Sequence, residues 1–316
     1  MNFAKGIHHI TAIGSDPQRL VDFYTGVLGL RLVKKTVNQD DVSAYHLFFG
    51  DKTGEPGMDL TFFTFPHAEP GSRGRGQVTR ISLAVPQASL PFWQDRVAQF
   101  DVKRESIQRL FGLERLVFHD FDDQRLELVG VAEEALSASP NFWTTNDIGT
   151  EQAIRHFHSA LLTVTNKASV ESILIEVLGC KVVETEGNIT LYYHDGLQRA
   201  AYLEVEEAPA LAMGYNAVGT VHHIAFAAES EAVQLELRQR VIELGLRPTE
   251  VIDRFYFKSV YFRIPAGILF EIATMGPGFT ADEPEGELGE KLSLPPFLEE
   301  YRSQIEANLV PVSVKQ

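Results

Sequence analysis

The sequence lacks the features that mark several classes of protein. It contains one cysteine, Cys180, so an internal disulfide cannot form, and a reducing compartment is expected. No apolar run approaches the roughly 18 residues of a membrane-spanning helix. His8 and His9 interrupt the apolar stretch near the N-terminus, where a secretory signal would need a continuous one. The sequence therefore predicts a cytoplasmic protein with no membrane association.

Positive charge is also scarce. The chain has 28 Lys and Arg against 43 Asp and Glu, which gives a formal net charge of −15 at pH 7. A nucleic-acid-binding protein would need a basic stripe or patch, so that class is excluded. The length of 316 residues is enough for about two domains with a sizeable core.

The chain does have repetition. Residues 6–13 (GIHHITAI) and 220–227 (TVHHIAFA) both carry His-His-Ile within a strand-like stretch. Each copy precedes a helical pattern and then further strand-like runs, a β-α-β-β-β order that recurs four times at a spacing of about 70 residues. The predicted modules span residues 1–70, 78–132, 155–208 and 218–275, and residues 276–316 form a C-terminal tail with a short helix.

One such module cannot bury both faces of its sheet, whereas two modules side by side make a curved sheet around a cavity. The predicted fold is therefore α+β, with four βαβββ modules forming two pseudo-symmetric, sheet-enclosed cavities. In the tail, residues 276–292 are rich in Gly, Pro and acidic residues, so we expect a flexible surface segment there.

Strand alternation selects one histidine from each pair, because neighbouring side chains point to opposite faces. His9 and His223 share a face with small side chains, which leaves room for a ligand. The preceding residues, His8 and His222, share a face with larger apolar side chains that would pack on helices. His9 and His223 are therefore the predicted metal ligands.

Glu271 is the candidate carboxylate ligand. It stands alone in the apolar stretch 266–273, where a charge is costly unless it is paired or bound to a metal. Aligning Gly57 of the first module with Gly267 of the fourth puts Thr61 in the place of Glu271. Two histidines and one carboxylate, with open positions opposite, are typical of non-haem Fe(II) oxygenases.

These segments, together with Tyr45–Leu47 and the run from Asp253 to Ala273, resemble the vicinal-oxygen-chelate superfamily of glyoxalases, bleomycin-resistance proteins and extradiol dioxygenases. Within it, nearly the whole chain is similar to the hydroquinone-type ring-cleaving dioxygenases. The resemblance implies Fe(II) held by His9, His223 and Glu271, with the metal joining the first and fourth modules.

The resemblance further implies catalytic roles for His8, His222, Arg254 and Tyr261. Arg254 could stabilise an anionic substrate or superoxide, and Tyr261 could donate a hydrogen bond to a ligated oxygen. A histidine near the metal could take the proton of a substrate hydroxyl. Strand alternation, in contrast, turns His8 and His222 away from the cavity, and both interpretations stay open.

The predicted function is an Fe(II)-dependent, extradiol-like dioxygenase that inserts both atoms of O₂ into a hydroquinone-type or related dihydroxy aromatic ring. Its partners would be a small aromatic substrate and O₂, and the sequence leaves a homo-oligomer open. Other divalent metals could occupy the site in a purified sample. One alternative is a glyoxalase-like lyase or isomerase with Zn²⁺ or Ni²⁺, against which Thr61 argues. Another is a metal-free protein that binds or sequesters a small molecule.

The remaining histidines are assigned no chemistry. His158 begins the third module, but residues 80–83 of the second offer no matching histidine or acid, so these two modules are predicted to be structural or to close a cavity. Five isolated histidines are expected to lie outside the site: His46, His67, His119, His156 and His194.

Overall fold

The computed structural model describes residues 3–137, 139–197 and 199–314. Residues 1–2 and 315–316, which belong to the predicted first module and to the tail, lie outside the described residues. Among the helices described, none is both long and apolar enough to cross a membrane.

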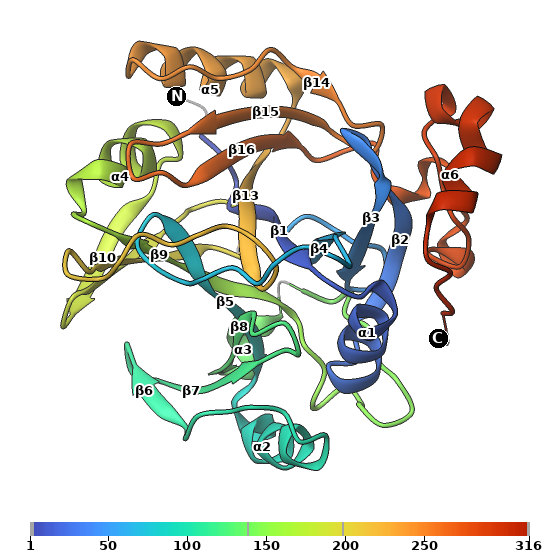
Figure 1. Cartoon of the computed structure of the whole chain (residues 1–316). Helices are drawn as coiled ribbons and strands as arrows, with labels where there is room; N and C mark the ends of the chain where they lie inside the picture. The colour runs from blue at the N-terminus through green and yellow to red at the C-terminus, as the bar shows by residue number, and fades with distance from the viewer. Residues whose placement is uncertain (1–2, 138, 198, 315–316) are drawn as a thin grey trace.

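Two eight-stranded sheets form the framework (Figure 1). The first sheet contains, in spatial order, β14 (Ile252–Asp253), β15 (Lys258–Arg263), β16 (Leu269–Thr274), β13 (Thr220–Ala228), β1 (Ile7–Gly14), β4 (Asp59–Thr64), β3 (Asp41–Gly50) and β2 (Arg31–Asn38). The second contains β10 (Lys181–Glu186), β11 (Ile189–Tyr193), β12 (Tyr202–Glu207), β9 (His156–Val164), β5 (Gln77–Pro86), β8 (Arg125–Val131), β7 (Leu113–His119) and β6 (Gln108–Leu110). The predicted α+β fold with two pseudo-symmetric sheets is confirmed.

Each sheet joins two modules along an antiparallel seam. In the first sheet β1 pairs with β13, so the first and fourth modules meet, and in the second β5 pairs with β9. Backbone hydrogen bonds link the sheets, from Ile7 N to Ala200 O (3.0 Å) and from Phe157 N to Gly57 O (2.8 Å). The seam of the first sheet therefore places the two His-His segments side by side.

Short helices cover the sheets and the connections. The α-helices are α1 (Pro17–Val21), α2 (Leu90–Gln99), α3 (Glu133–Leu136), α4 (Ala168–Ser172), α5 (Glu231–Glu243) and α6 (Arg302–Asn308), and 3₁₀ turns are η2 (Gln87–Ser89), η4 (Phe279–Ala281), η5 (Glu285–Glu287) and η6 (Pro296–Tyr301). Two predicted helices continue as π-helices, η1 (Asp22–Val27) after α1 and η3 (Ile173–Val177) after α4. The wider π-helical turn of η1 allows three apolar side chains, Phe23, Tyr24 and Val27, to be buried together.

Residues 276–292 lie at the surface, as expected, and most of them are exposed, but specific contacts hold the segment against the sheet instead of leaving it flexible. Lys34 of β2 is fully buried, and its ammonium group pairs with Asp282 (2.7 Å) and with Glu283. A buried charge is tolerated only when it is paired, and two of the acidic residues that suggested a solvated segment, Asp282 and Glu283, are partners of this lysine. Phe279 and Leu288 are buried beside them, and the segment packs on the first sheet.

Candidate metal centre

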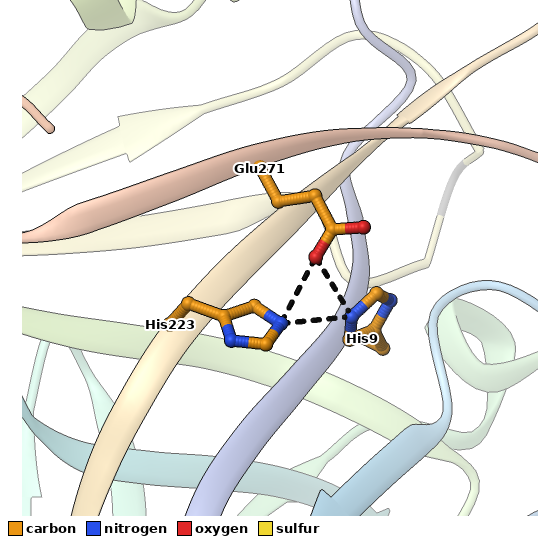
Figure 2. Close-up of side chains that lie close together, drawn as sticks. All are labelled: His9, His223 and Glu271. Carbon is orange, nitrogen blue, oxygen red and sulfur yellow. Dashed lines mark hydrogen bonds and ion pairs between the residues drawn. The ribbon is translucent and has the colours of Figure 1, made fainter. Parts of the chain in front are cut away.

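Three neighbouring strands of the first sheet bring His9, His223 and Glu271 together. His9 lies on β1, His223 on β13 and Glu271 on β16. Thr11 pairs with His223 across the antiparallel seam, and Ala225 pairs with Glu271 across the parallel one. The three side chains point toward one another (Figure 2). Residues more than 200 positions apart in sequence thus share one buried point, as the sequence predicts.

The separations between the three ligand atoms suit a single metal ion. Nε2 of His9 and Nε2 of His223 are 3.2 Å apart. Oε2 of Glu271 lies 3.2 Å from the first nitrogen and 2.9 Å from the second. Two ligand atoms that are each about 2.1 Å from an ion and at right angles to each other lie about 3.0 Å apart. The arrangement therefore fits three ligands on one face of an octahedron.

The carboxylate itself indicates that a cation belongs between these atoms. Oε1 of Glu271 accepts a hydrogen bond of 2.5 Å from Ser259. Oε2 is buried and has no partner in hydrogen-bond geometry among the described residues, although two imidazole nitrogens are close to it. Burial alone would raise the pKa of Glu271, but His9 and His223 hold that pKa well below its usual range. A metal ion would satisfy the unpartnered charged oxygen.

A hydrogen-bond chain fixes the proton of His9 on the nitrogen that faces away from this point. Nε2 of His8 lies 3.1 Å from the carbonyl oxygen of Thr274, so it must be protonated and donate. Burial lowers the pKa of His8 to about 3, so its ring is neutral and its Nδ1 can only accept. That Nδ1 is 3.0 Å from Nδ1 of His9, which therefore donates. Nε2 of His9 is left as a free lone pair, the form that binds a metal.

His222 stands in the same relation to His223. The two Nδ1 atoms are 2.8 Å apart, and burial lowers the pKa of His222 to about 3. The hydrogen-bond direction in which Nδ1 of a neutral His222 accepts from Nδ1 of His223 is the one that leaves Nε2 of His223 free for a metal. Both His-His pairs thus have the same internal arrangement, with the second residue directed at the ligand point and the first in contact with the second.

The expectation that His8 and His222 pack against helices is wrong, and the reason is a pair of β-bulges. On β1 the pairing passes from Ile7 to His9, so His8 is an extra, unpaired residue, and on β13 His222 is skipped between Val221 and His223 in the same way. A bulge breaks the strict alternation of side chains and re-aims the extra residue. His8 consequently lies against the ring of Phe257, and His222 against that of Phe63.

Thr61 occupies the position related to Glu271 by the internal pseudo-symmetry. It pairs with Thr11, two residues after His9, just as Glu271 pairs with Ala225, two residues after His223. Its hydroxyl lies 2.8 Å from that of Thr11, whose own oxygen is 3.0 Å from Nε2 of His223. The predicted equivalence of Thr61 and Glu271 is confirmed, and the described cluster contains three metal-ligating side chains rather than four.

A small cavity adjoins the three ligands. Aromatic side chains form much of its wall, and it encloses about 40 Å³. Its lining is His9, Thr36, Asn38, Gln39, Asp40, His46, Phe48, Phe63, His223, Arg254, Tyr256, Phe257 and Tyr261. Asp40 is the exposed member of this set, which places the mouth of the cavity at the turn between β2 and β3.

His46 was expected outside the site, but the structure places it in the cavity wall. Its Nε2 lies 2.9 Å from the hydroxyl of Thr61, and burial keeps its pKa well below the usual value. The sequence did hold a signal for this position, because β3 pairs with β4. Phe48 is opposite Thr61, and alternation puts His46 on the same face as Phe48.

Arg254 and Tyr261, for which the family resemblance implies catalytic roles, both lie in the cavity wall. The guanidinium of Arg254 is 5.4 Å from the ring centroid of Tyr261, and it forms two hydrogen bonds to the carboxylate of Asp40 at 2.8 and 3.1 Å. Burial alone would lower the pKa of Arg254, but hydrogen bonding to Asp40 raises it above the usual value. The cation is therefore neutralised by Asp40 in this structure.

Comparison with known proteins identifies the family. Residues 6–164 match the sequence profile of the glyoxalase/bleomycin resistance protein/dioxygenase superfamily. The chain belongs to this superfamily.

Two full-length relatives show where in the superfamily it lies. MhqO of Bacillus subtilis (strain 168), which carries the name of a ring-cleaving dioxygenase, is 40% identical over 98% of this chain and 97% of its own. A chlorohydroquinone/hydroquinone 1,2-dioxygenase of Sphingobium indicum is 33% identical and covers 95% and 94%.

Solved structures in the superfamily show the same architecture. A Bacillus subtilis protein described as a dioxygenase superposes with a TM-score of 0.94, at 40% identity and complete coverage of both chains. Glyoxalase I from Zea mays, as a mutant, superposes with a TM-score of 0.65 at 14% identity, over 86% of this chain and 94% of its own. At that identity the second likeness concerns the fold alone.

Proposed function

We propose that this protein is an Fe(II)-dependent dioxygenase that opens the ring of a hydroquinone-type substrate and places both atoms of O₂ in the ring-opened product. The supporting observation is the three-ligand point formed by His9, His223 and Glu271, at which Thr61 stands where a fourth ligand would be. Three ligands leave positions on a metal for both an organic substrate and O₂. The names of the full-length relatives agree with a ring-cleaving activity.

Iron bound at this point would supply the path by which electrons pass from the aromatic ring to O₂. The chain's own residues bind and orient the ring. Phe48, Phe63 and Phe257 give the cavity flat apolar walls, and the hydroxyl of Tyr261 and the imidazole of His46 supply polar contacts for ring oxygens. We assign the histidine that faces the substrate to His46. His8 and His222 act instead through His9 and His223, whose tautomers they fix.

Substrate entry requires a rearrangement at the mouth. A cavity of about 40 Å³ is smaller than the roughly 150 Å³ known to hold benzene. The mouth is closed by the Asp40–Arg254 ion pair and by a hydrogen bond of 2.9 Å from Gln39 Nε2 to the carbonyl oxygen of Arg254. We propose that these contacts open to admit the ring, after which Arg254 is free to face the oxygen atoms of the substrate.

Oxygen consumption tests this function directly. The protein is loaded anaerobically with Fe(II), iron content is measured, and O₂ uptake is recorded with hydroquinone, methylhydroquinone, chlorohydroquinone and catechol. We expect uptake of one O₂ per ring with at least one hydroquinone, and incorporation of both ¹⁸O atoms from ¹⁸O₂ into the product. Iron-loaded protein that consumes no O₂ with any of the four would reject the proposal.

The same experiment separates the alternatives. A glyoxalase-like isomerase would act on its substrate with Zn²⁺ or Ni²⁺ and without O₂. A metal-free binding protein would keep its ligand affinity after His9→Ala and His223→Ala, whereas the proposed dioxygenase loses both metal and activity in each variant.

A further inference from the structure

The second sheet has a point equivalent to the metal centre, but different residues occupy it. Ser82 pairs with Glu127 as Ala225 pairs with Glu271, so Glu127 corresponds to the metal-centre carboxylate and Arg80 to His223. Leu161 pairs with Glu204 as Thr11 pairs with Thr61, so Ser159 corresponds to His9 and Glu204 to Thr61. The two bulges recur as well, at Thr79 and His158.

Arginine and glutamate side chains form a closed network at this second point. Glu204 accepts from Arg80 Nη2 at 2.5 Å and from Arg115 Nη1 at 2.7 Å, and Glu127 accepts from Arg115 Nη1 at 3.1 Å. All four side chains are buried. Two positive and two negative charges balance, so the network is electrically complete without a metal ion.

Above this network lies a cavity much larger than the one beside the metal centre. Its volume is about 580 Å³, against about 40 Å³ for the first. Arg115 forms part of its floor, and His158 and Tyr202 form a stacked pair in its wall, with ring centroids 5.2 Å apart and planes inclined by 17°. Leu113 and Tyr193 add further apolar surface. A planar aromatic molecule fits both the size and the walls.

Two buried groups in the lining lack hydrogen-bond partners, and they have complementary roles. Nε and Nη2 of Arg115 are donors without acceptors among the described residues. His156 is neutral, because burial lowers its pKa to about 4. Its Nδ1 lies 2.7 Å from the carbonyl oxygen of Phe157 and 3.4 Å from the amide of Ala200. The shorter contact places the proton on Nδ1, so Nε2, which also lacks a partner, is an acceptor.

We propose that this second cavity is a binding site for a neutral aromatic molecule that carries a hydroxyl group. A phenolic oxygen can accept from Arg115 while an O–H of the ligand donates to His156, and both unpartnered groups are then satisfied. An aromatic carboxylate has acceptors but no proton to donate, and it would also bring an anion close to Glu127 and Glu204. The floor is already neutral, and Arg199 in the wall is paired with Glu55 and Asp51, so the site selects for a hydroxyl rather than for charge.

Calorimetric titration of the full-length, metal-loaded protein with phenol, anisole and benzoate tests this site without any turnover. Anisole keeps the ring and an acceptor oxygen but has no hydroxyl proton. We expect phenol to bind at least about tenfold more tightly than anisole or benzoate. Ala135 of α3 is exposed and lines the cavity, so Ala135→Trp should weaken phenol binding at least about tenfold by filling the space. Ala98→Trp, on an exposed face of α2 outside the lining, should leave it unchanged.

A second variant keeps the test decisive if Ala135→Trp folds poorly in urea titrations. His156→Phe removes the acceptor but keeps a flat ring, so the preference for phenol over anisole should disappear. Phenol binding that is absent, or that is equal in wild type, Ala135→Trp and His156→Phe, overturns the proposal, as does benzoate binding as tight as that of phenol. These outcomes measure ligand binding and not metal-centred chemistry, so they test this site independently of the proposed dioxygenase activity.

Discussion

At the metal centre two histidines surround the single carboxylate of Glu271, whereas at the equivalent point of the second sheet two arginines balance two glutamates. The first set is short of positive charge and leaves a buried carboxylate oxygen unpartnered. The second set is neutral without an ion. The same strand pairing can therefore hold either a metal or an ion-pair network, and the charges of the side chains decide which one it holds.

The largest expected difference between the two sheets is in metal binding after one carboxylate is removed from each. Glu271→Ala is expected to abolish metal binding and O₂ uptake, because the remaining histidines are two neutral ligands with no charge to hold a dication. Glu127→Ala removes the corresponding carboxylate of the second sheet and should leave metal content at the wild-type level in the folded fraction. Metal analysis of both purified variants checks this, and metal retained by Glu271→Ala would contradict the ligand assignment.

In the second sheet, loss of a glutamate should instead lower the free energy of unfolding. Glu204→Leu leaves Arg80 and Arg115 with one carboxylate between them, and breaking a buried pair in this way costs about 3–5 kcal/mol of unfolding free energy. Urea denaturation measures the loss. Glu207→Leu, at the exposed end of the same strand, is the control and should have little effect. Similar stabilities for the two variants would show that the network is not coupled to folding.

The histidines that contact the ligands should have an intermediate effect. His8→Phe and His222→Phe each remove the acceptor that keeps the proton of the neighbouring ligand on Nδ1, and metal affinity should fall by about 10–100-fold. Competition with a metal chelator measures this. His67→Phe, an exposed histidine, serves as the control. If activity fell while metal affinity did not, these residues would act on the substrate rather than on the ligands.

Thr61→Glu would make the metal centre more symmetric. A second carboxylate should hold the metal at least as firmly and occupy a position needed by substrate or O₂, so the rate of O₂ uptake should fall by roughly tenfold, equivalent to about 1.4 kcal/mol in the barrier. Thr61→Gln tests the effect of volume alone. A metal-loaded Thr61→Glu variant with the wild-type rate would contradict the claim that a fourth ligand blocks a position needed by substrate or O₂.

The smallest effect is expected at the mouth of the metal-centre cavity. Asp40→Asn weakens the pairing with Arg254, so closure should be less firm and KM for a hydroquinone should change by about twofold to fivefold, in line with an exposed ion pair of up to about 1 kcal/mol. Metal content should not change. Asp41→Asn, a neighbour on the same turn, is the control, and an equal effect in both variants would argue against a specific closing contact.

Local patterns in the sequence were sufficient for much of the fold. The four β-α-β-β-β modules follow from apolar periodicity and glycine positions, because both report which side of a strand or helix is buried. The ligand candidates follow from one acid in an apolar strand and from two matching His-His pairs. Thr61 could be placed opposite Glu271 because repeats with the same strand order share a register.

Contacts between distant segments explain what local patterns could not give. The bulges at His8 and His222 depend on how β1 meets β13, and alternation within one strand does not reveal them. The acidic stretch after residue 276 has the composition of a solvated loop, but its pairing with buried Lys34 and the burial of Phe279 and Leu288 make it part of the packed structure. Arg254 is charged in any fold, but its neutralisation depends on Asp40 reaching across the cavity mouth.

The repeated His-His-Ile segments determined, from sequence alone, that this chain carries a candidate metal centre built from its first and fourth modules. Strand alternation in the sequence also selected His9 and His223 as the ligands, whereas the bulges that place His8 and His222 against them were decided by the seam between β1 and β13. Tertiary structure also decided that the second sheet lines a large cavity, whose floor is a charge-neutral network of arginine and glutamate side chains. The physical reason is the same in both cases: burial makes a polar group depend on its partners, and those partners come from strands far away in the chain.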